Sequence, residues 1–179
     1  MDRVLVRFEA ADAAATKAAA ARLAPLLQGG DLIILSGGLG AGKTTFTQGL
    51  GAALAVQGTV SSPTFVIVRE HPIVAGNHLR PRALVHVDAY RLGGAVELDA
   101  LDLDTALADS VTVIEWGSGV AESLSADRLE ISIERPRGNF SADDDPESGV
   151  RVITCRGVGL RWADVDLAGL GARPADSVG

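Results

Sequence analysis

The chain has 179 residues, a formal net charge of −7 and an apolar content of 47%, so it is long enough for one domain with a sizeable core and too short for two full domains. The negative charge argues against nucleic acid as the main direct ligand, because a nucleic-acid surface needs clustered lysine and arginine. No run approaches the roughly 18 apolar residues of a membrane span, and residues 1–4 lack the basic start of a secretory signal, so we expect a soluble, cytoplasmic protein without membrane contact.

The N-terminal third predicts a strand, a helix and a second strand. Residues 4–8 alternate in polarity as a strand does, and Asp12 is placed to cap a helix that runs through an alanine-rich stretch to about Leu27. Pro25 is expected to bend or end that helix. Residues 32–35 form a short apolar run, which predicts a buried strand.

A complete G-x-x-x-x-G-K-[ST] pattern follows this strand at residues 37–44, and residues 44–55 read as a helix. A glycine-rich turn between a strand and a helix lets backbone N–H groups surround phosphate oxygens. The alternative, a turn that binds nothing, does not account for the strand and the helix on either side. The pattern predicts that Lys43 reaches the β- and γ-phosphates and that the Thr44 hydroxyl is a Mg²⁺ ligand. The nucleotide-binding residues are then Gly37, Gly38, Leu39, Gly40, Ala41, Gly42, Lys43, Thr44 and Thr45.

The next segment contains a loop at residues 61–63 and a β-branched, strand-like stretch at residues 64–68. Thr64, at the start of that stretch, is a candidate for sensing the γ-phosphate, with ordinary turn chemistry as the alternative. Residues 71–82 are expected to be a connection. Its basic stretch, residues 80–82, is interpreted as a solvated loop, with an RNA contact as the alternative.

Two further apolar strands each end in a carboxylate. Residues 83–87 precede Asp88, residues 111–114 precede Glu115, and the stretch between them, residues 95–108, is predicted to be helical. An apolar run that ends in Asp or Glu is the usual form of the carboxylate that holds Mg²⁺ in a P-loop protein. A helix cap or a surface position is the alternative for either residue, but a magnesium–nucleotide site needs at least one of them.

The C-terminal third predicts a hairpin of strands at residues 129–133 and 150–154, joined by an acidic, solvated segment around residues 143–147. Cys155 is interpreted as a small buried residue on a strand. A short helix is expected at residues 162–170, and residues 172–179 are expected to be a disordered tail. The predicted fold is an α/β, P-loop NTPase-like mixed β-sheet flanked by helices, with an antiparallel C-terminal hairpin, in a single nucleotide-binding domain over residues 1–171.

Four motifs in this order and spacing resemble the TsaE family, the bacterial ATPase component of tRNA threonylcarbamoyladenosine synthesis. They are the P-loop through Phe46, Ser-Pro-Thr-Phe at residues 62–65, His-Val-Asp-Ala-Tyr-Arg-Leu at residues 86–92, and Glu-Trp-Gly at residues 115–117. The resemblance covers about residues 30–118 with specific motifs and the remainder more loosely.

The resemblance implies roles for particular residues. Lys43 and Thr44 act on the phosphates and Mg²⁺, Glu115 is a magnesium-site carboxylate, Asp88 is an essential acidic residue near the γ-phosphate that also serves the metal site, and Thr64 belongs to a switch-like loop. Trp116, which follows Glu115 as in the family, is either a core residue at a strand end or a participant in turnover.

Two positions and one segment depart from the family pattern. Gly38 stands where the family commonly has an acidic residue, and Asp102 stands where a glycine is usual. The acidic segment around residues 143–147 is not part of the family signature.

The resemblance further implies an ATPase that uses Mg²⁺ and ATP, releases ADP, and resets a complex of TsaD-type and TsaB-type proteins, contacting tRNA only indirectly. Turnover is expected to be slow without these partners, since no arginine is evidently placed as a finger. Two alternatives stay open: a small-molecule kinase with Asp88 as the base, and a non-catalytic adaptor gated by nucleotide. A GTPase is weaker, because the sequence contains no N-K-x-D motif.

Overall fold

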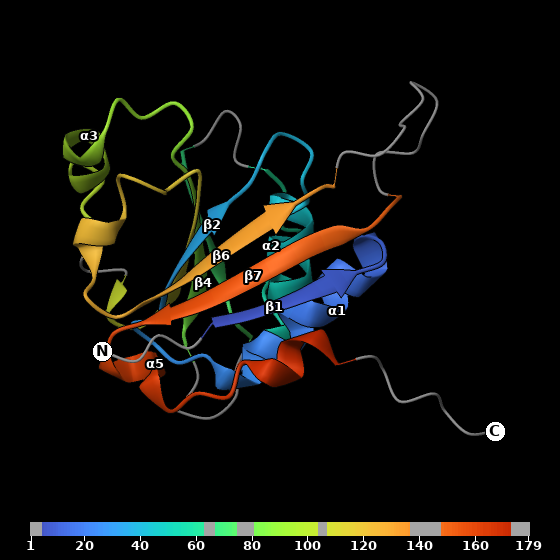
Figure 1. The fold of residues 1–179 in the computed structure, drawn as a ribbon. Helices are drawn as coiled ribbons and strands as arrows, with labels where there is room; N and C mark the ends of the chain where they lie inside the picture. The colour runs from blue at the N-terminus through green and yellow to red at the C-terminus, as the bar shows by residue number, and fades with distance from the viewer. Residues whose placement is uncertain (1–4, 63–66, 75–80, 104–106, 137–147, 173–179) are drawn as a thin grey trace.

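The computed structural model describes residues 5–62, 67–74, 81–103, 107–136 and 148–172. Across these residues the strands form one sheet in the order β1-β7-β6-β2-β5-β4-β3 (Figure 1). The central strands β6, β2, β5 and β4 are parallel, while β1 and β7 on one side and β3 on the other are antiparallel to their neighbours. The predicted parallel core with antiparallel extensions is therefore confirmed. The strands are β1 (Leu5–Ala10), β2 (Leu32–Ser36), β3 (Val68–Pro72), β4 (Ala83–Asp88), β5 (Val111–Glu115), β6 (Arg128–Glu134) and β7 (Arg151–Val158).

Two helices, α1 (Ala13–Leu23) and α2 (Lys43–Ala53), lie together on one side of the sheet (Figure 1). The predicted cap at Asp12 is confirmed, because its carboxylate accepts a hydrogen bond of 2.8 Å from the Ala15 N–H. Beyond Leu23 the chain tightens into the 3₁₀ helix η1 (Ala24–Leu26), which contains Pro25. The first helix thus ends where proline removes a backbone donor.

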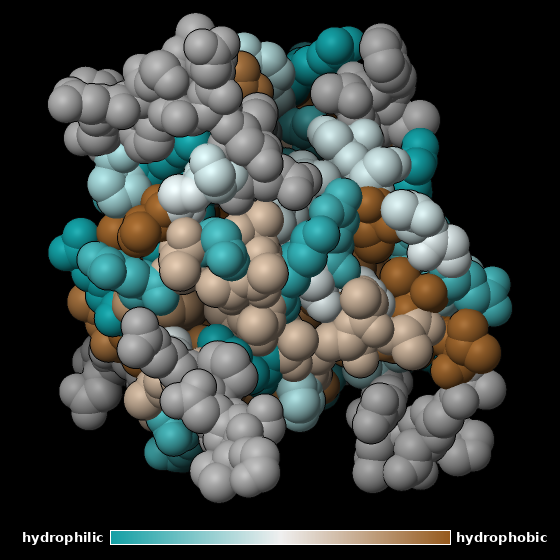
Figure 2. Space-filling view, turned by 90° about the vertical axis from the view of Figure 1, so that its right-hand side faces the viewer, coloured by the Kyte–Doolittle hydropathy of each residue, from teal (hydrophilic) through white to brown (hydrophobic). Residues whose placement is uncertain are grey.

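The two helices pack closely because α2 presents a glycine to α1. A Cβ at Gly49 would lie 2.6 Å from the Cα of Lys17, so a larger residue there would push the helices apart. The outer side of α1 is visible in Figure 2 as weakly hydrophobic, pale brown atoms with hydrophilic ones among them, and its exposed positions include Ala14, Lys17 and Ala21. Alanine has a high helix propensity, and its small side chain leaves little apolar surface exposed to water.

The core is divided between the two faces of the sheet. On the face covered by α1 and α2, the buried residues include Phe46, Leu50 and the strand residues Ile33, Leu35 and Val113. On the opposite face, β2, β5 and β4 pack against the short helices α3 (Ala95–Asp99) and η2 (Glu122–Leu124) and the segments around them. The strands β6 and β7 present half-buried polar side chains to that second face, as an antiparallel sheet facing water does.

Two predictions for the middle of the chain differ from the structure. The continuous helix predicted at residues 95–108 is wrong, because α3 ends at Asp99 and Asp102 follows in the left-handed region with φ of 49°. Leu107 is helical again, and residues 104–106 lie outside the described residues. A single left-handed residue ends a helix, which explains why a glycine suits this position. The strand expected at residues 64–68 is instead β3, which begins at Val68 and runs to Pro72 into the predicted connection; residues 64–66 lie outside the described residues.

The C-terminal hairpin is confirmed, with β6 and β7 paired antiparallel. Cys155 is buried on β7 as expected, and burial raises the pKa of its thiol to about 12. The single helix predicted at residues 162–170 is wrong: the chain forms α5 (Leu160–Ala163), then a non-helical stretch, then the 3₁₀ helix η3 (Ala168–Gly171). The tail prediction for residues 172–179 lies outside the described residues from position 173 onward. In the described part of the chain no helix has the length and apolar character needed to cross a membrane.

Candidate nucleotide site

The loop at residues 37–42 joins the end of β2 to the start of α2, as the motif predicts. Its conformation needs glycine: φ is 147° at Gly37 and 111° at Gly42, and Gly42 is the residue that precedes the first turn of α2. A Cβ at Gly37 would also collide with the carbonyl oxygen of Ile133 on β6. The loop is therefore fixed by both its backbone angles and its contact with the neighbouring strand.

Lys43 is folded back over this loop. Its Nζ donates hydrogen bonds of 2.9 Å to the carbonyl oxygens of Gly37 and Gly38, and it lies 3.9 Å from the centre of the Trp116 ring. Burial lowers the pKa of Lys43, while the negative charges of Glu115 and Asp88 act in the opposite direction. The ammonium is thus held in a desolvated position where a phosphate oxygen would be an attractive partner.

Trp116 is held at this point by an unusual backbone conformation. Its φ is 61°, which is a rare conformation for a bulky residue, and its N–H donates to the carbonyl oxygen of Leu35 on β2. Its ring lies 5.1 Å from that of Tyr90. The Tyr90 ring is tilted by 57° relative to the Trp116 ring, and the Lys43 ammonium also contacts the Trp116 ring, so the three side chains form one group beside the loop.

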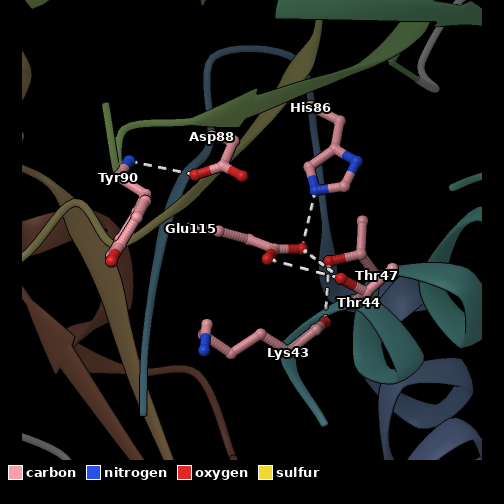
Figure 3. A network of polar contacts seen from close by, with 7 residues as sticks. All are labelled: Lys43, Thr44, Thr47, His86, Asp88, Tyr90 and Glu115. Carbon is pink, nitrogen blue, oxygen red and sulfur yellow. Dashed lines mark hydrogen bonds and ion pairs between the residues drawn. The ribbon is translucent and has the colours of Figure 1, made fainter. Parts of the chain in front are cut away.

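The two predicted carboxylates lie side by side, because Asp88 and Glu115 are register partners on the parallel strands β4 and β5. Glu115 accepts from the hydroxyl of Thr44, at 3.2 Å to Oε1 and 3.4 Å to Oε2, and from Nε2 of His86 at 2.8 Å (Figure 3). Asp88 accepts from the N–H of Tyr90 at 2.9 Å. The structure thus brings together Lys43, Thr44, Asp88 and Glu115 as the sequence predicts.

This donor set suits Mg²⁺. The hydroxyl oxygen of Thr44 and the two carboxylates are hard oxygen ligands, and Mg²⁺ keeps several waters and uses phosphate oxygens as further ligands. Among the described residues there is no cluster of three or more His, Cys, Asp or Glu side chains that could hold a metal by itself. A magnesium ion here would depend on the nucleotide for part of its coordination.

These residues surround a cavity of about 570 Å³, which is within the range of small-molecule sites. Six of the nine predicted nucleotide-binding positions line this cavity, and Gly37, Gly38 and Ala41 do not. Leu39, at the tip of the loop, is 95% exposed. Thr64 and the segment at residues 143–147 lie outside the described residues. The cavity is lined by Leu39, Gly40, Gly42, Lys43, Thr44, Thr45, Ser62, Asp88, Tyr90, Arg91, Glu115, Trp116 and Arg151.

Two residues of the site were missed by the sequence reasoning. Arg151, at the start of β7, is buried beside the P-loop and donates from Nε to the carbonyl oxygen of Ala41 at 3.0 Å. It is 110 positions away from Ala41, and no local pattern marks it. His86 was recognised only as part of a motif. It lies two residues before Asp88 on a strand, which indicates that both side chains lie on the same face of the sheet.

The fold and the site define this protein as a member of the P-loop NTPase-like class. The family model for "Threonylcarbamoyl adenosine biosynthesis protein TsaE" matches residues 10–141. The chain is 53% identical over 148 residues to a TsaE protein of Streptomyces coelicolor, covering 82% of this chain and 93% of the relative, and 37% identical to that of Bacillus subtilis, covering 82% of each. The crystal structure of Bacillus subtilis YdiB superposes with a TM-score of 0.66 at 29% identity, over 90% of this chain and 91% of YdiB.

The chain therefore belongs to the TsaE family, whose members are named for a role in the biosynthesis of tRNA threonylcarbamoyladenosine. The suspected family and the predicted fold class are both confirmed.

Proposed function

We propose that this protein is a cytoplasmic, Mg²⁺-dependent ATPase that resets a threonylcarbamoyl-transferring complex of TsaD-type and TsaB-type proteins. The observation that carries the proposal is the convergence of Lys43, Thr44, Asp88 and Glu115 on one cavity at the end of the parallel strands. The ligand of an open α/β sheet lies at this end. Residues 1–171 are proposed to act as one nucleotide-binding domain.

The proposed reaction is the attack of water on the γ-phosphorus of ATP, with ADP as the leaving group. Lys43 exchanges its carbonyl partners for phosphate oxygens and offsets their negative charge, and the loop N–H groups hold the phosphates in place. Thr44 and Glu115 would hold the metal, which would supply positive charge against the phosphates of the nucleotide. Asp88, oriented by the Tyr90 N–H, lies beside this group and is the candidate for fixing the attacking water.

Turnover by the isolated protein is proposed to be slow. Arg91 and Arg151 both line the cavity, and Arg151 donates to the carbonyl oxygens of Ala41, Ser148 and Gly149. Arg91 and an arginine of a partner are both candidates for further stabilisation of the transition state, and an arginine supplied by a partner is a common route to faster phosphoryl transfer. The net charge of −7 suits contact with proteins that themselves hold RNA, so tRNA would be contacted only indirectly.

Phosphate release from ATP and Mg²⁺, measured with and without purified TsaD-type and TsaB-type proteins, tests the proposal. Hydrolysis that depends on the partners supports it. Nucleotide binding without hydrolysis in either condition would instead identify a nucleotide-gated adaptor, and transfer of the γ-phosphate to a small molecule would identify a kinase. Absence of nucleotide binding would overturn the assignment of the site.

A further inference from the structure

His86 lies entirely inside the protein behind the carboxylate of Glu115. The exposed fraction of its side chain is 0%, and that of Glu115 is 4%. Because an ionised carboxylate only accepts hydrogen bonds, the 2.8 Å contact is an N–H donated by Nε2 of His86 to Oε1 of Glu115. In Figure 3, His86 lies on one side of Glu115 and Lys43 lies on the other.

Core packing alone does not explain this histidine. The Nδ1 atom of His86 is buried and has no hydrogen-bond partner among the described residues. Leaving a buried polar atom without a partner costs about 1–3 kcal/mol, so an apolar residue would fill this position at lower cost. The neighbouring strand positions Leu84 and Val87 are occupied by such residues and are equally buried.

The hydrogen bond from His86 goes to the carboxylate of Glu115, which also accepts from the Thr44 hydroxyl. Thr44 lies almost equally far from the two oxygens of Glu115, at 3.2 and 3.4 Å, so it does not by itself select an orientation of the carboxylate. The shorter bond from His86 goes to Oε1, and it therefore fixes the rotation of the group. The second oxygen, Oε2, accepts the longer bond of 3.4 Å from Thr44, and Glu115 lines the cavity in which the metal would lie.

We propose that His86 is a positioning residue that orients Glu115 for the divalent cation of the nucleotide complex, an inference that rests on the proposed Mg²⁺–ATP function. A partner that fixes a metal-site side chain from behind typically changes metal affinity or activity by about 10–100-fold when it is removed. His86 and Asp88 are two residues apart on β4, so one strand supplies both a carboxylate at the cavity and the support for its neighbour.

The test measures Mn²⁺, as a paramagnetic substitute for Mg²⁺, by electron paramagnetic resonance in the presence of a non-hydrolysable ATP analogue. His86→Leu removes the donor and is expected to weaken Mn²⁺ binding in this ternary complex by about tenfold or more. His86→Gln can place an amide N–H where Nε2 lies and is expected to restore binding to within about threefold of the parent protein. Affinity for the analogue in EDTA is expected to stay within about twofold in both, because the hydrogen bond of His86 goes to the carboxylate of Glu115 and not to the phosphate-binding loop.

His71 provides a matched control. It is a second buried histidine, on the adjacent strand β3, and its Nε2 also has no partner among the described residues. His71→Leu is expected to leave Mn²⁺ binding at the parent level. If His86→Leu does not fold, as judged by thermal unfolding, His86→Asn replaces it, since its shorter amide does not reach Glu115.

The outcomes separate the two proposals. The role of His86 would be overturned if His86→Leu or His86→Asn bound Mn²⁺ as tightly as the parent protein. It would also be overturned if His71→Leu weakened Mn²⁺ binding equally, or if His86→Gln did not restore it. Each of these outcomes would leave the proposed function intact. Failure of the parent protein to bind Mn²⁺ with the analogue would overturn both.

Discussion

At the scale of single residues, Lys43 and Asp88 are expected to act at different stages. Lys43→Ala removes the ammonium that offsets phosphate charge, so we expect ATP affinity to fall by about tenfold or more. Asp88→Ala leaves the loop and Lys43 in place, so affinity should stay within about threefold while hydrolysis falls by about 100-fold. Titration with a fluorescent ATP analogue and phosphate release with partners measure the two effects. Parent-rate hydrolysis by both variants would contradict the site assignment.

Some residues of the site can be predicted from the sequence and others cannot. The P-loop, Asp88 and Glu115 could be predicted because each lies in a local pattern whose physical requirement is visible in the chain. The support of Glu115 by His86 and of the P-loop by Arg151 could not, since both depend on contacts across 29 and 110 positions. Such contacts are set by strand register, which the sequence does not state directly.

At the scale of elements, Arg161 ties α5 to the start of β2. Its guanidinium makes two bonds of 2.9 Å to the carboxylate of Asp31, of which only 3% is exposed, and a third of 2.7 Å to the carbonyl oxygen of Leu26. Arg161→Ala would leave a buried charge without its partner, and we expect the free energy of unfolding at pH 7 to fall by about 3 kcal/mol. Arg128→Ala, which breaks a more exposed pair with Glu130, should cost less than about 1 kcal/mol.

The loss of stability caused by Arg161→Ala should depend on pH. Burial raises the pKa of Asp31, and the hydrogen bonds from Gln28 and Arg161 oppose that rise. A raised pKa in the folded state means that the contribution of Asp31 to stability is greatest below the unfolded value of 3.8 and is lost as pH rises through the folded value. Removing Arg161 raises the pKa further, so the difference in stability from the parent should shrink as the pH in urea unfolding is lowered from 7 toward the unfolded value of 3.8. An equal difference at both ends of this range would contradict this explanation.

Another prediction concerns the turn after α3, where Asp102 has φ of 49°. Glycine adopts this conformation without steric cost, so Asp102→Gly should raise the free energy of unfolding by about 0.5–1 kcal/mol. Asp99→Gly, at the exposed last residue of α3, should lower it by a few tenths of a kcal/mol through lost helix propensity. Urea unfolding of both variants is the measurement, and destabilisation by Asp102→Gly would contradict the argument.

This turn also explains why the helix at residues 95–108 was predicted wrongly. The stretch contains good helix formers and no glycine or proline, so nothing in its composition marks the end at Asp99. The strands were predicted more accurately, because buried parallel strands appear as short, continuous apolar runs. The position of β3 was predicted less accurately, because β3 is an edge strand that contains the charged residues Arg69 and Glu70. These residues interrupt the apolar run by which a buried strand is predicted.

At the scale of the whole molecule, ligand binding should appear as added stability. A ligand that binds only the folded state at 100 times its Kd adds about 2.7 kcal/mol, which corresponds to a rise in Tm of about 5–10 °C for a chain of this size. We expect this rise with ATP and Mg²⁺ in thermal unfolding, and a smaller rise both when EDTA replaces Mg²⁺ and for Lys43→Ala. Equal shifts in the parent protein with Mg²⁺ and with EDTA would contradict a metal-dependent site.

The pairing of β1 with β7 has a consequence for synthesis on the ribosome. Among the described strands β1 is the first one made, and the strand that it pairs with is β7, at residues 151–158. At about 5–20 residues per second, β1 waits for several seconds or more before its partner leaves the ribosome. During that time its backbone N–H and C=O groups are open to pairing with other chains. A nascent chain that stalls before residue 151 would therefore carry the whole P-loop and yet expose an unpaired strand, which makes it a substrate for chaperones.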